Sequence, residues 1–515
     1  MDSNNKSSPL EVLTAKEERF EEIRKKTGLF IGPAAGLIIY FIPFGGLSQQ
    51  AHLLAAIVSF TVVWWISEPV PIPVTALLAT SLCVISGVGS VKDVLAPFAD
   101  QIIFLFMGSF ILAKAMSVHG LDKRFAFGIM SLKWVGNSSG RILFVFGAIT
   151  AFISVWVSNT ATTAMMLPIG LGIVGVMANL VGEKTGKSVS PESLVFGTGM
   201  MLMVAYSASV GGIGSPVGTP PNLIGIAMIE KFTHVKIHFF TWMAFAFPLL
   251  VIMFVFLFIL MYFLHKPELK NISGSHDYII SERKMLGKWK RGEINSLLAF
   301  AITVFLWVLP GILSIIYGKD AWVTKLYSNI LPEGIVAIMG AVLLFILPVN
   351  FREREFTIKW KDAVKINWGT LILFGGGLSL GNLMFETKLA EDIGLALTGF
   401  AGSGSVWILT LTAIYISILA SEAASNTASA NMVIPVMISV SVAAGLNPVP
   451  PAVGATLGAS WGFMLPVSTP PNAIVYGTGM VPIRKMVRTG IIFDIAGGLI
   501  IWIGLRIMLP LLNLA

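Results

Sequence analysis

Charge and cysteine are both scarce in this 515-residue chain. Charged residues make up 12% of it, and Cys83 is the only cysteine. A soluble globule of this length needs far more polar material to cover its surface, so the shortage of charge excludes that class. A single cysteine excludes an intrachain disulfide, and packing must therefore hold the fold together.

Recognisable catalytic patterns are missing as well. The chain has no HExxH, Walker A or CxxC motif, and its few histidines are scattered. Neither a metal cluster nor a nucleophile with its base is apparent. We therefore predict that the protein is not an enzyme and carries no bound cofactor. The six histidines are His52, His119, His234, His238, His265 and His276.

Long apolar runs are abundant instead. Hydrophobic residues make up 55% of the chain and the mean hydropathy is +0.82. About 20 apolar residues in a helix cross the roughly 30 Å of hydrocarbon in a bilayer. We predict an all-α polytopic protein embedded in the lipid bilayer, with 11 spans near 28–46, 51–67, 70–90, 100–118, 193–230, 238–264, 292–317, 331–349, 366–387, 448–480 and 488–511.

Two further segments, 137–178 and 403–443, are too polar at their middles to be ordinary spans. We predict that each is a re-entrant hairpin, which enters and leaves on one side. The loops then alternate, and 27 of the 35 Lys and Arg fall on one side. The positive-inside rule makes that side, with the N-terminus, cytoplasmic. The net charge of +8 is thus a topology signal, and we expect no nucleic-acid partner. We expect the plasma (inner) membrane.

The two halves of the chain repeat two motifs. The triplet Ser158-Asn159-Thr160 recurs as Ser425-Asn426-Thr427, and "SPVGTPPNLI" from Ser215 recurs as "LPVSTPPNAI" from Leu465. Because the two hairpins open from opposite sides, the copies have inverted topology. Paired inverted repeats with interrupted helices are the architecture of secondary transporters.

Each motif also predicts the start of a half-helix inside the membrane. Ser, Asn and Thr are strong N-cap residues, and proline is favoured at the first helical position. Four helix starts could converge, and helix N-termini attract anions without a buried cation. We predict a small di- or tricarboxylate substrate. The substrate-binding candidates are Asn159, Thr160, Thr219, Pro220, Asn426, Thr427, Thr469 and Pro470.

A second repeat concerns hydroxyl groups. Ser154 precedes Ser158 by four residues, and Ser421 precedes Ser425 by four. At this spacing each pair lies on one helix face, where hydroxyls and freed carbonyls could bind a hard cation such as Na⁺. Gly218 and Ser468 could add carbonyls from the facing loops. The alternative is that each serine hydroxyl bonds back to its own helix.

These motifs, with the stretch "WWISEPVPIPVTALL" from Trp64, resemble the divalent anion/sodium symporter (DASS) family over nearly the whole chain. The resemblance implies an 11-span homodimer with two hairpins that works as an elevator, in which a transport domain slides against a scaffold. It implies dicarboxylates of the succinate, malate, fumarate and 2-oxoglutarate class, or citrate, as substrates. It also implies two sodium sites, one around Ser154, Ser158, Asn159 and Gly218, and one around Ser421, Ser425, Asn426 and Ser468.

The expected domains follow the repeats. Residues 1–27 form a cytoplasmic segment and 265–291 a cytoplasmic connector. The scaffold comprises 28–118 and 292–387. The transport domain comprises 119–264, with hairpin 137–178 and broken helix 193–230, and 388–515, with hairpin 403–443 and broken helix 448–480.

Glu422 stands out because its counterpart in the first half is Val155. It is either a solvated residue near the outer mouth or a group that titrates or replaces a cation requirement. Some members of the family exchange dicarboxylates without sodium, so sodium symport, which we favour slightly, and exchange both remain open. An anion channel is the alternative from a different class, since broken helices also line pores.

Overall fold

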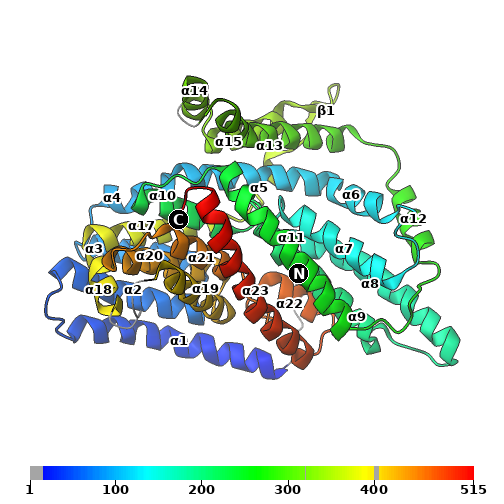
Figure 1. Cartoon of the computed structure of the whole chain (residues 1–515), viewed down its shortest axis with the longest axis horizontal. Helices are drawn as coiled ribbons and strands as arrows, with labels where there is room; N and C mark the ends of the chain where they lie inside the picture. The colour runs from blue at the N-terminus through cyan, green and yellow to red at the C-terminus, as the bar shows by residue number, and fades with distance from the viewer. Residues whose placement is uncertain (1–14, 319–320, 399–404) are drawn as a thin grey trace, which may run out of the picture.

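The computed structural model describes residues 15–318, 321–398 and 405–515, and these are overwhelmingly helical (Figure 1). One small antiparallel sheet, β1 (Pro348–Asn350) with β2 (Glu355–Phe356), is the exception. The predicted all-α polytopic fold class is confirmed. Residues 1–14 of the predicted N-terminal segment and 403–404 of the second hairpin lie outside the described residues.

The helices before the middle of the chain are α1 (Ala15–Phe41), α2 (Gln49–Ser67), α3 (Ile72–Ile85), α4 (Val91–Leu95), the 3₁₀ helix η1 (Ala96–Ala99), α5 (Gln101–His119), α6 (Leu121–Met130), α7 (Ser139–Ser154), α8 (Asn159–Thr185), the 3₁₀ helix η2 (Pro191–Ser193), α9 (Val195–Gly212), α10 (Pro220–Thr233), α11 (Phe239–Leu264) and α12 (Ser275–Met285). Those after it are α13 (Arg291–Tyr317), α14 (Trp322–Ile330), α15 (Glu333–Ile346), α16 (Trp360–Ala363), α17 (Trp368–Glu386), α18 (Leu389–Thr398), α19 (Val406–Ala423), α20 (Asn426–Ala443), α21 (Val449–Ala459), α22 (Pro470–Tyr476) and α23 (Ile483–Leu511).

Within the described residues, ten helical segments are long and apolar enough to cross a membrane, and the bent pair α14 and α15 would make an eleventh. Three of the ten, α8, α19 and α20, belong to the segments predicted as re-entrant, because length and composition do not separate a hairpin arm from a full span. One predicted span is less regular than expected, since segment 70–90 holds only the 14-residue α3. Segment 448–480, predicted as a broken helix, is divided into α21 and the short α22.

The chain breaks at the repeated motifs. The first triplet separates α7 from α8, and the second separates α19 from α20. The hydroxyls of Ser158 and Ser425 each accept a backbone N–H three residues later and so cap α8 and α20. Pro220 and Pro470 are the first residues of α10 and α22, where proline needs no hydrogen-bond acceptor.

Corresponding helices of the two halves make reciprocal contacts. Helix α10 of the first half packs on α20 and α21, and α22 of the second half packs on α8 and α9. Figure 1 shows α10 beside α20 and α21, and α22 close to α9. Each broken helix thus crosses into the other half. The loops that interrupt the two broken helices, residues 213–219 and 460–469, are called break loops below and lie in the interior of the protein.

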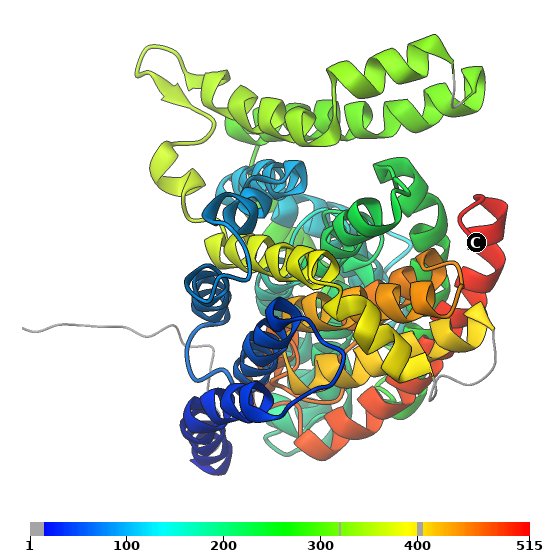
Figure 2. The same cartoon turned by 90° about the vertical axis from the view of Figure 1, so that its left-hand side faces the viewer.

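Figure 2 shows α13, α14 and α15 as an outer layer of the molecule, and α15 packs on α5 beneath it. Many apolar side chains of this layer are exposed, including Phe305 and Met339. Such a surface suits lipid or another protein.

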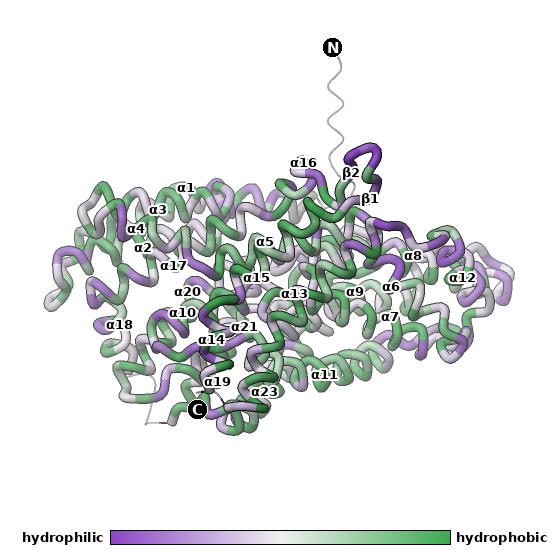
Figure 3. Tube along the Cα trace, turned by 90° about the horizontal axis from the view of Figure 1, so that it is seen from above, coloured by the Kyte–Doolittle hydropathy of each residue, from purple (hydrophilic) through white to green (hydrophobic). Residues whose placement is uncertain are grey.

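Hydrophilic segments lie around α12 and around the β1–β2 sheet, among other places, as the purple parts of the trace in Figure 3 show. At the end that carries α12, Arg124 forms a 2.9 Å ion pair with Glu293, and Arg283 donates to Ser131 at 2.8 Å. These contacts join loops 118–141 and 265–293, which the alternation of basic residues predicts on the same side.

Candidate functional site

The first candidate site lies behind the tip of the first hairpin. Ser154 is fully buried at the end of α7, and its Oγ donates to Asn159 Oδ1 at 2.8 Å. The four-residue turn between α7 and α8 brings these two predicted ligands together. Since Ser154 bonds Asn159 and, at 3.5 Å, the Val157 carbonyl ahead of it, the back-bonding alternative does not describe it.

The break loop between α9 and α10 closes this site from the other side. Asn222 is fully buried, and its Nδ2 donates to the carbonyls of Gly212 at 2.9 Å and Ser215 at 2.8 Å. A Cβ at Gly212 would collide with the Asn159 amide, and one at Gly218 would collide with the Gly212 carbonyl. Glycine at both positions thus lets the loop backbone approach the hairpin tip closely.

The second half repeats this arrangement. Ser421 Oγ donates to Asn426 Oδ1 at 2.8 Å, as Ser154 does to Asn159. Asn472 Nδ2 donates to the carbonyls of Gly462 at 3.2 Å and Leu465 at 3.1 Å. Ser468 Oγ donates to the Gly462 carbonyl at 3.1 Å. Every one of these positions corresponds to its partner in the first half, at an offset of 267 for the tip and 250 for the loop.

Ser421 does not bond back to its own helix either. Besides Asn426, its hydroxyl donates to the Ala459 carbonyl of α21 at 2.9 Å. Each site thus gathers hydroxyl, amide and backbone carbonyl oxygens, which hard cations prefer. The side-chain oxygens of Asn222 and Asn472 are fully buried without a hydrogen-bond partner. Two unused acceptors at equivalent positions fit a small cation such as Na⁺.

The structure places the remaining predicted site residues at helix caps or at partly exposed positions of the tips and helix starts. The hydroxyls of Ser158 and Ser425 cap their helices, so they are already engaged. Thr160 is exposed and Thr427 half-buried at the two tips, while Pro220 is half-buried and Pro470 exposed. Among the described residues, no hydrogen bond joins the first tip to the second. Convergence of the four helix starts on one substrate therefore remains a prediction.

Two expectations about the helix starts need correction. Thr219 precedes α10, but its hydroxyl caps nothing, because the N–H of Asn222 donates to the Thr219 carbonyl at 3.2 Å. Thr469 does cap α22 through its hydroxyl, at 3.4 Å from the Asn472 nitrogen. Helix α22 has only seven residues, too few turns to build a strong dipole. The fourth N-terminus therefore contributes less than expected.

Glu422 is not solvated. It is 5% exposed, and its carboxylate accepts from the backbone N–H of Met464 at 2.8 Å and of Leu465 at 3.2 Å. The interpretation of Glu422 as a solvated residue is therefore wrong. The carboxyl group of Asp494 in α23, 3% exposed, lies against it.

Sequence reasoning missed several residues of these sites. Gly212 and Gly462 offer backbone carbonyls, which leave no sequence signature. Asn222 and Asn472 stand in the repeated TPPN motif, so their duplication was an available signal. Asp494 carried a signal too, as a lone acidic residue in a long apolar run.

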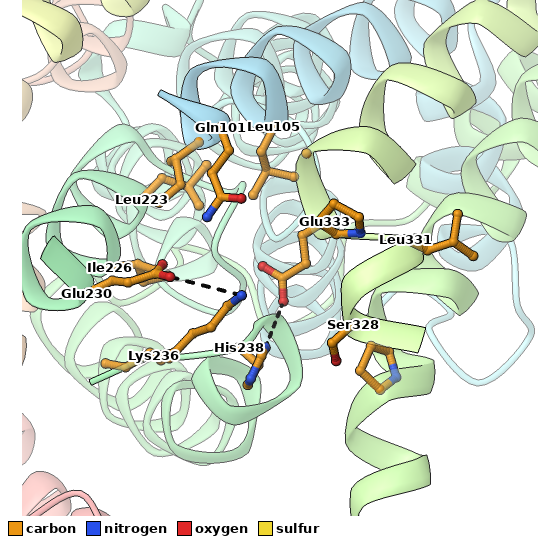
Figure 4. A pocket seen from close by; sticks show the side chains of 15 residues that line it. Gln101, Leu105, Leu223, Ile226, Glu230, Lys236, His238, Ser328, Leu331 and Glu333 are labelled. Atoms are coloured by element: carbon orange, nitrogen blue, oxygen red, sulfur yellow. Dashed lines mark ion pairs between the residues drawn. The ribbon is translucent and has the colours of Figure 1, made fainter. Parts of the chain in front are cut away.

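A separate small cavity lies among α5, α10, α13, α14, α15 and the segment 236–238 that leads into α11 (Figure 4). Its lining includes two ion pairs, Lys236 with Glu230 at 4.0 Å and His238 with Glu333 at 3.7 Å. Glu333 also accepts from the Phe239 N–H at 2.9 Å and so caps α11. None of the predicted site residues lines this cavity, which instead marks a charged junction between α11 and α15.

Interrupted membrane helices that meet in duplicate around oxygen-rich buried sites define a membrane transport protein rather than an enzyme. Comparison with known sequences identifies the particular family. The family model of the sodium:sulfate symporter transmembrane region matches residues 24–512, and the chain belongs to this family, the DASS transporters. The predicted family is confirmed.

Individual curated relatives also match most of the chain. The chain is 35% identical over 480 residues to the sodium-dependent dicarboxylate transporter SdcS of Staphylococcus saprophyticus, covering 92% of this chain and 89% of that one. It is 32% identical to SdcS of Staphylococcus aureus strain USA300, covering 94% and 91%.

Two solved structures share the fold at low sequence identity. Neisseria gonorrhoeae MtrF, described as illuminating a class of antimetabolite efflux pumps, matches with a TM-score of 0.54 and 13% identity, covering 89% of this chain and 95% of that one. The Alcanivorax borkumensis YdaH transporter matches at 0.50 and 12%, covering 84% and 89%. These likenesses concern the fold alone.

Proposed function

We propose that the protein is a secondary carrier that moves small dicarboxylates across the plasma membrane together with sodium ions. The observation that carries this proposal is the duplicated oxygen cluster, Ser154 with Asn159 and Ser421 with Asn426, each closed by a break loop. The names of the SdcS relatives, sodium-dependent dicarboxylate transporters, support the same ion and the same class of substrate.

The two asparagines link ion to substrate. Each uses its side-chain oxygen to accept from the serine behind it, which leaves the amide N–H groups free to donate. Asn159 and Asn426 are also half-buried at their tips, where a ligand can reach them. A dicarboxylate with one anionic group for each tip suits two such donors, and the hydroxyls of Thr160 and Thr427 lie next to them.

Uptake of labelled succinate into proteoliposomes tests the function. We expect accumulation inside liposomes when sodium is present outside, and competition by unlabelled malate and fumarate. Saturable uptake favours a carrier, whereas ohmic single-channel currents would support the alternative of a channel.

We further propose an elevator movement in a homodimer. The scaffold would comprise 28–118 and 292–387, and the moving parts 119–264 and 388–515. Packing of α15 on α5 and of α17 on α3 supports the grouping of the scaffold, and the reciprocal contacts of α10 and α22 support a single moving body. The exposed apolar layer of α13 to α15 offers surface for lipid or a second copy.

Topology gives a direct prediction. Single cysteines replacing the exposed residues Lys288 and Lys92, in a Cys83→Ala background, should label with an impermeant maleimide from opposite faces. We expect Lys288→Cys to react from the cytoplasm, because it lies in a strongly basic loop. Intact cells and inverted vesicles give the two measurements. Labelling of both positions from one face would contradict the inverted topology.

The junction of α11 and α15 tests the elevator. His238→Cys with Glu333→Cys, in the Cys83→Ala background, should be bridged by a short bifunctional thiol reagent, since the native side chains lie 3.7 Å apart. Bridging should stop succinate uptake, because it ties a moving helix to the scaffold, and a cleavable reagent should allow recovery. A matched control, Glu355→Cys with Lys359→Cys, joins two exposed scaffold residues and should leave uptake intact. Full uptake by the bridged junction would argue against relative movement there.

A further inference from the structure

The two candidate ion sites differ in one contact, the one between the break loop and the hairpin arm. In the first half, Ser215 Oγ donates to the carbonyl of Val155 at 2.5 Å, so a neutral contact ties the break loop to the hairpin arm. In the second half the equivalent positions are Leu465 and Glu422. There the tie is a carboxylate that accepts two backbone N–H groups of the loop. The repeats therefore share their geometry but not their charge.

Glu422 is connected to the second candidate ion site in two ways, along the chain and through hydrogen bonds. It directly follows Ser421, whose hydroxyl faces Asn426 and lies close to Gly462. It also holds Met464 and Leu465, which belong to the loop that supplies Gly462 and Ser468. Removing the carboxylate would leave two buried N–H groups without an acceptor and loosen that loop.

In the described part of the chain, no positive side chain pairs with this charge. The described residues around Glu422 contain Asp494 from α23 and Tyr206 from α9, whose hydroxyl donates to the Phe463 carbonyl at 2.5 Å. Neither Glu422 nor Asp494 forms an ion pair with any Lys, Arg or His described in the structure. Two adjacent buried carboxyl groups do not both ionise, and the charge is favoured on Glu422, whose oxygens accept two backbone N–H groups. A buried carboxylate without a counter-ion attracts a cation over several ångströms, because the surrounding protein screens charge poorly.

We propose that the Glu422 carboxylate makes the second ion site the tighter of the two, so that sodium fills the site around Ser421 before the site around Ser154. Glu422 is a positioning residue here: it orders the loop and adds charge, and it does not touch the substrate. The inference rests on the proposed sodium coupling and adds an order of binding to it. The first site, closed by the neutral tie of Ser215 to Val155, then fills at higher sodium.

The test is sodium-dependent thermal stabilisation of the purified protein, with choline replacing sodium at constant ionic strength. In the wild type, stabilisation should begin at low sodium. Glu422→Gln should raise the sodium needed for half of this effect by on the order of tenfold. The exposed carboxylate Glu386, replaced in Glu386→Gln, is the matched control and should behave as the wild type. An unchanged sodium dependence in Glu422→Gln would overturn the proposal.

A second comparison leaves Glu422 in place, in case its variant does not fold. Ser421→Ala should remove the response at low sodium, whereas Ser154→Ala should retain it and lose the response at high sodium. The reverse pattern, or equal effects, would overturn the binding order. A wild type that shows no sodium response at all would contradict the proposed sodium coupling itself, which distinguishes the two failures.

Discussion

Asn159→Ala and Asn426→Ala should each weaken dicarboxylate uptake by about ten- to a hundredfold while the protein stays folded. Each asparagine accepts from the serine behind it, at 2.8 Å in both halves, and in the proposed mechanism it presents its amide N–H groups to the substrate. Losing one donor to a carboxylate costs roughly 1.5–3 kcal/mol, and each 1.4 kcal/mol is about tenfold in affinity.

The measurement is the concentration dependence of succinate uptake by purified variants in proteoliposomes. Asn329→Ala, at an exposed position of α14, controls for the loss of an asparagine elsewhere. Size-exclusion chromatography and the melting temperature show whether each variant folds. Wild-type kinetics in both tip variants would remove the tips from the substrate site.

The tips show which parts of such a site can be predicted from local chemistry. A Ser-Asn-Thr triplet in an apolar segment indicates an N-cap, since its hydroxyl satisfies N–H groups that nothing else in hydrocarbon can satisfy. Ser158 and Ser425 do cap their helices. Repetition of the triplet and of the TPPN motif then predicted which segments belong together.

Tertiary contacts decided what the sequence alone could not predict. The carbonyls of Gly212 and Gly462 are held in their loops by the amides of Asn222 and Asn472, and a carbonyl has no side-chain identity to recognise. The contact of Glu422 with Asp494 joins α19 to α23 across 72 positions of the chain, so no local pattern reveals it. The 53° bend between α14 and α15 falls at Pro332, which precedes α15 and cannot continue a helix, whereas hydropathy alone does not show this break.

Sodium should control uptake into empty liposomes almost completely. If both serine sites bind sodium, each dianion travels with at least two cations, and the initial rate should rise with outside sodium more steeply than first order. Replacing sodium with choline should abolish net uptake. Ser154→Ala and Ser421→Ala should shift the dependence to higher sodium before they change substrate specificity, because their hydroxyls face the ion side of Asn159 and Asn426.

Exchange predicts the opposite pattern in the same liposomes. If only the loaded carrier crosses the membrane, empty liposomes should take up almost nothing, preloaded ones should exchange rapidly, and sodium should be irrelevant. Glu422 would then become the residue to test, since a buried carboxylate without a cation hinders the return of an empty carrier. Glu422→Gln should restore net uptake in that case. The duplicated clusters favour symport, because each brings together the hydroxyl and amide oxygens that hard cations prefer. Sodium-independent uptake that requires an internal dicarboxylate would defeat this conclusion.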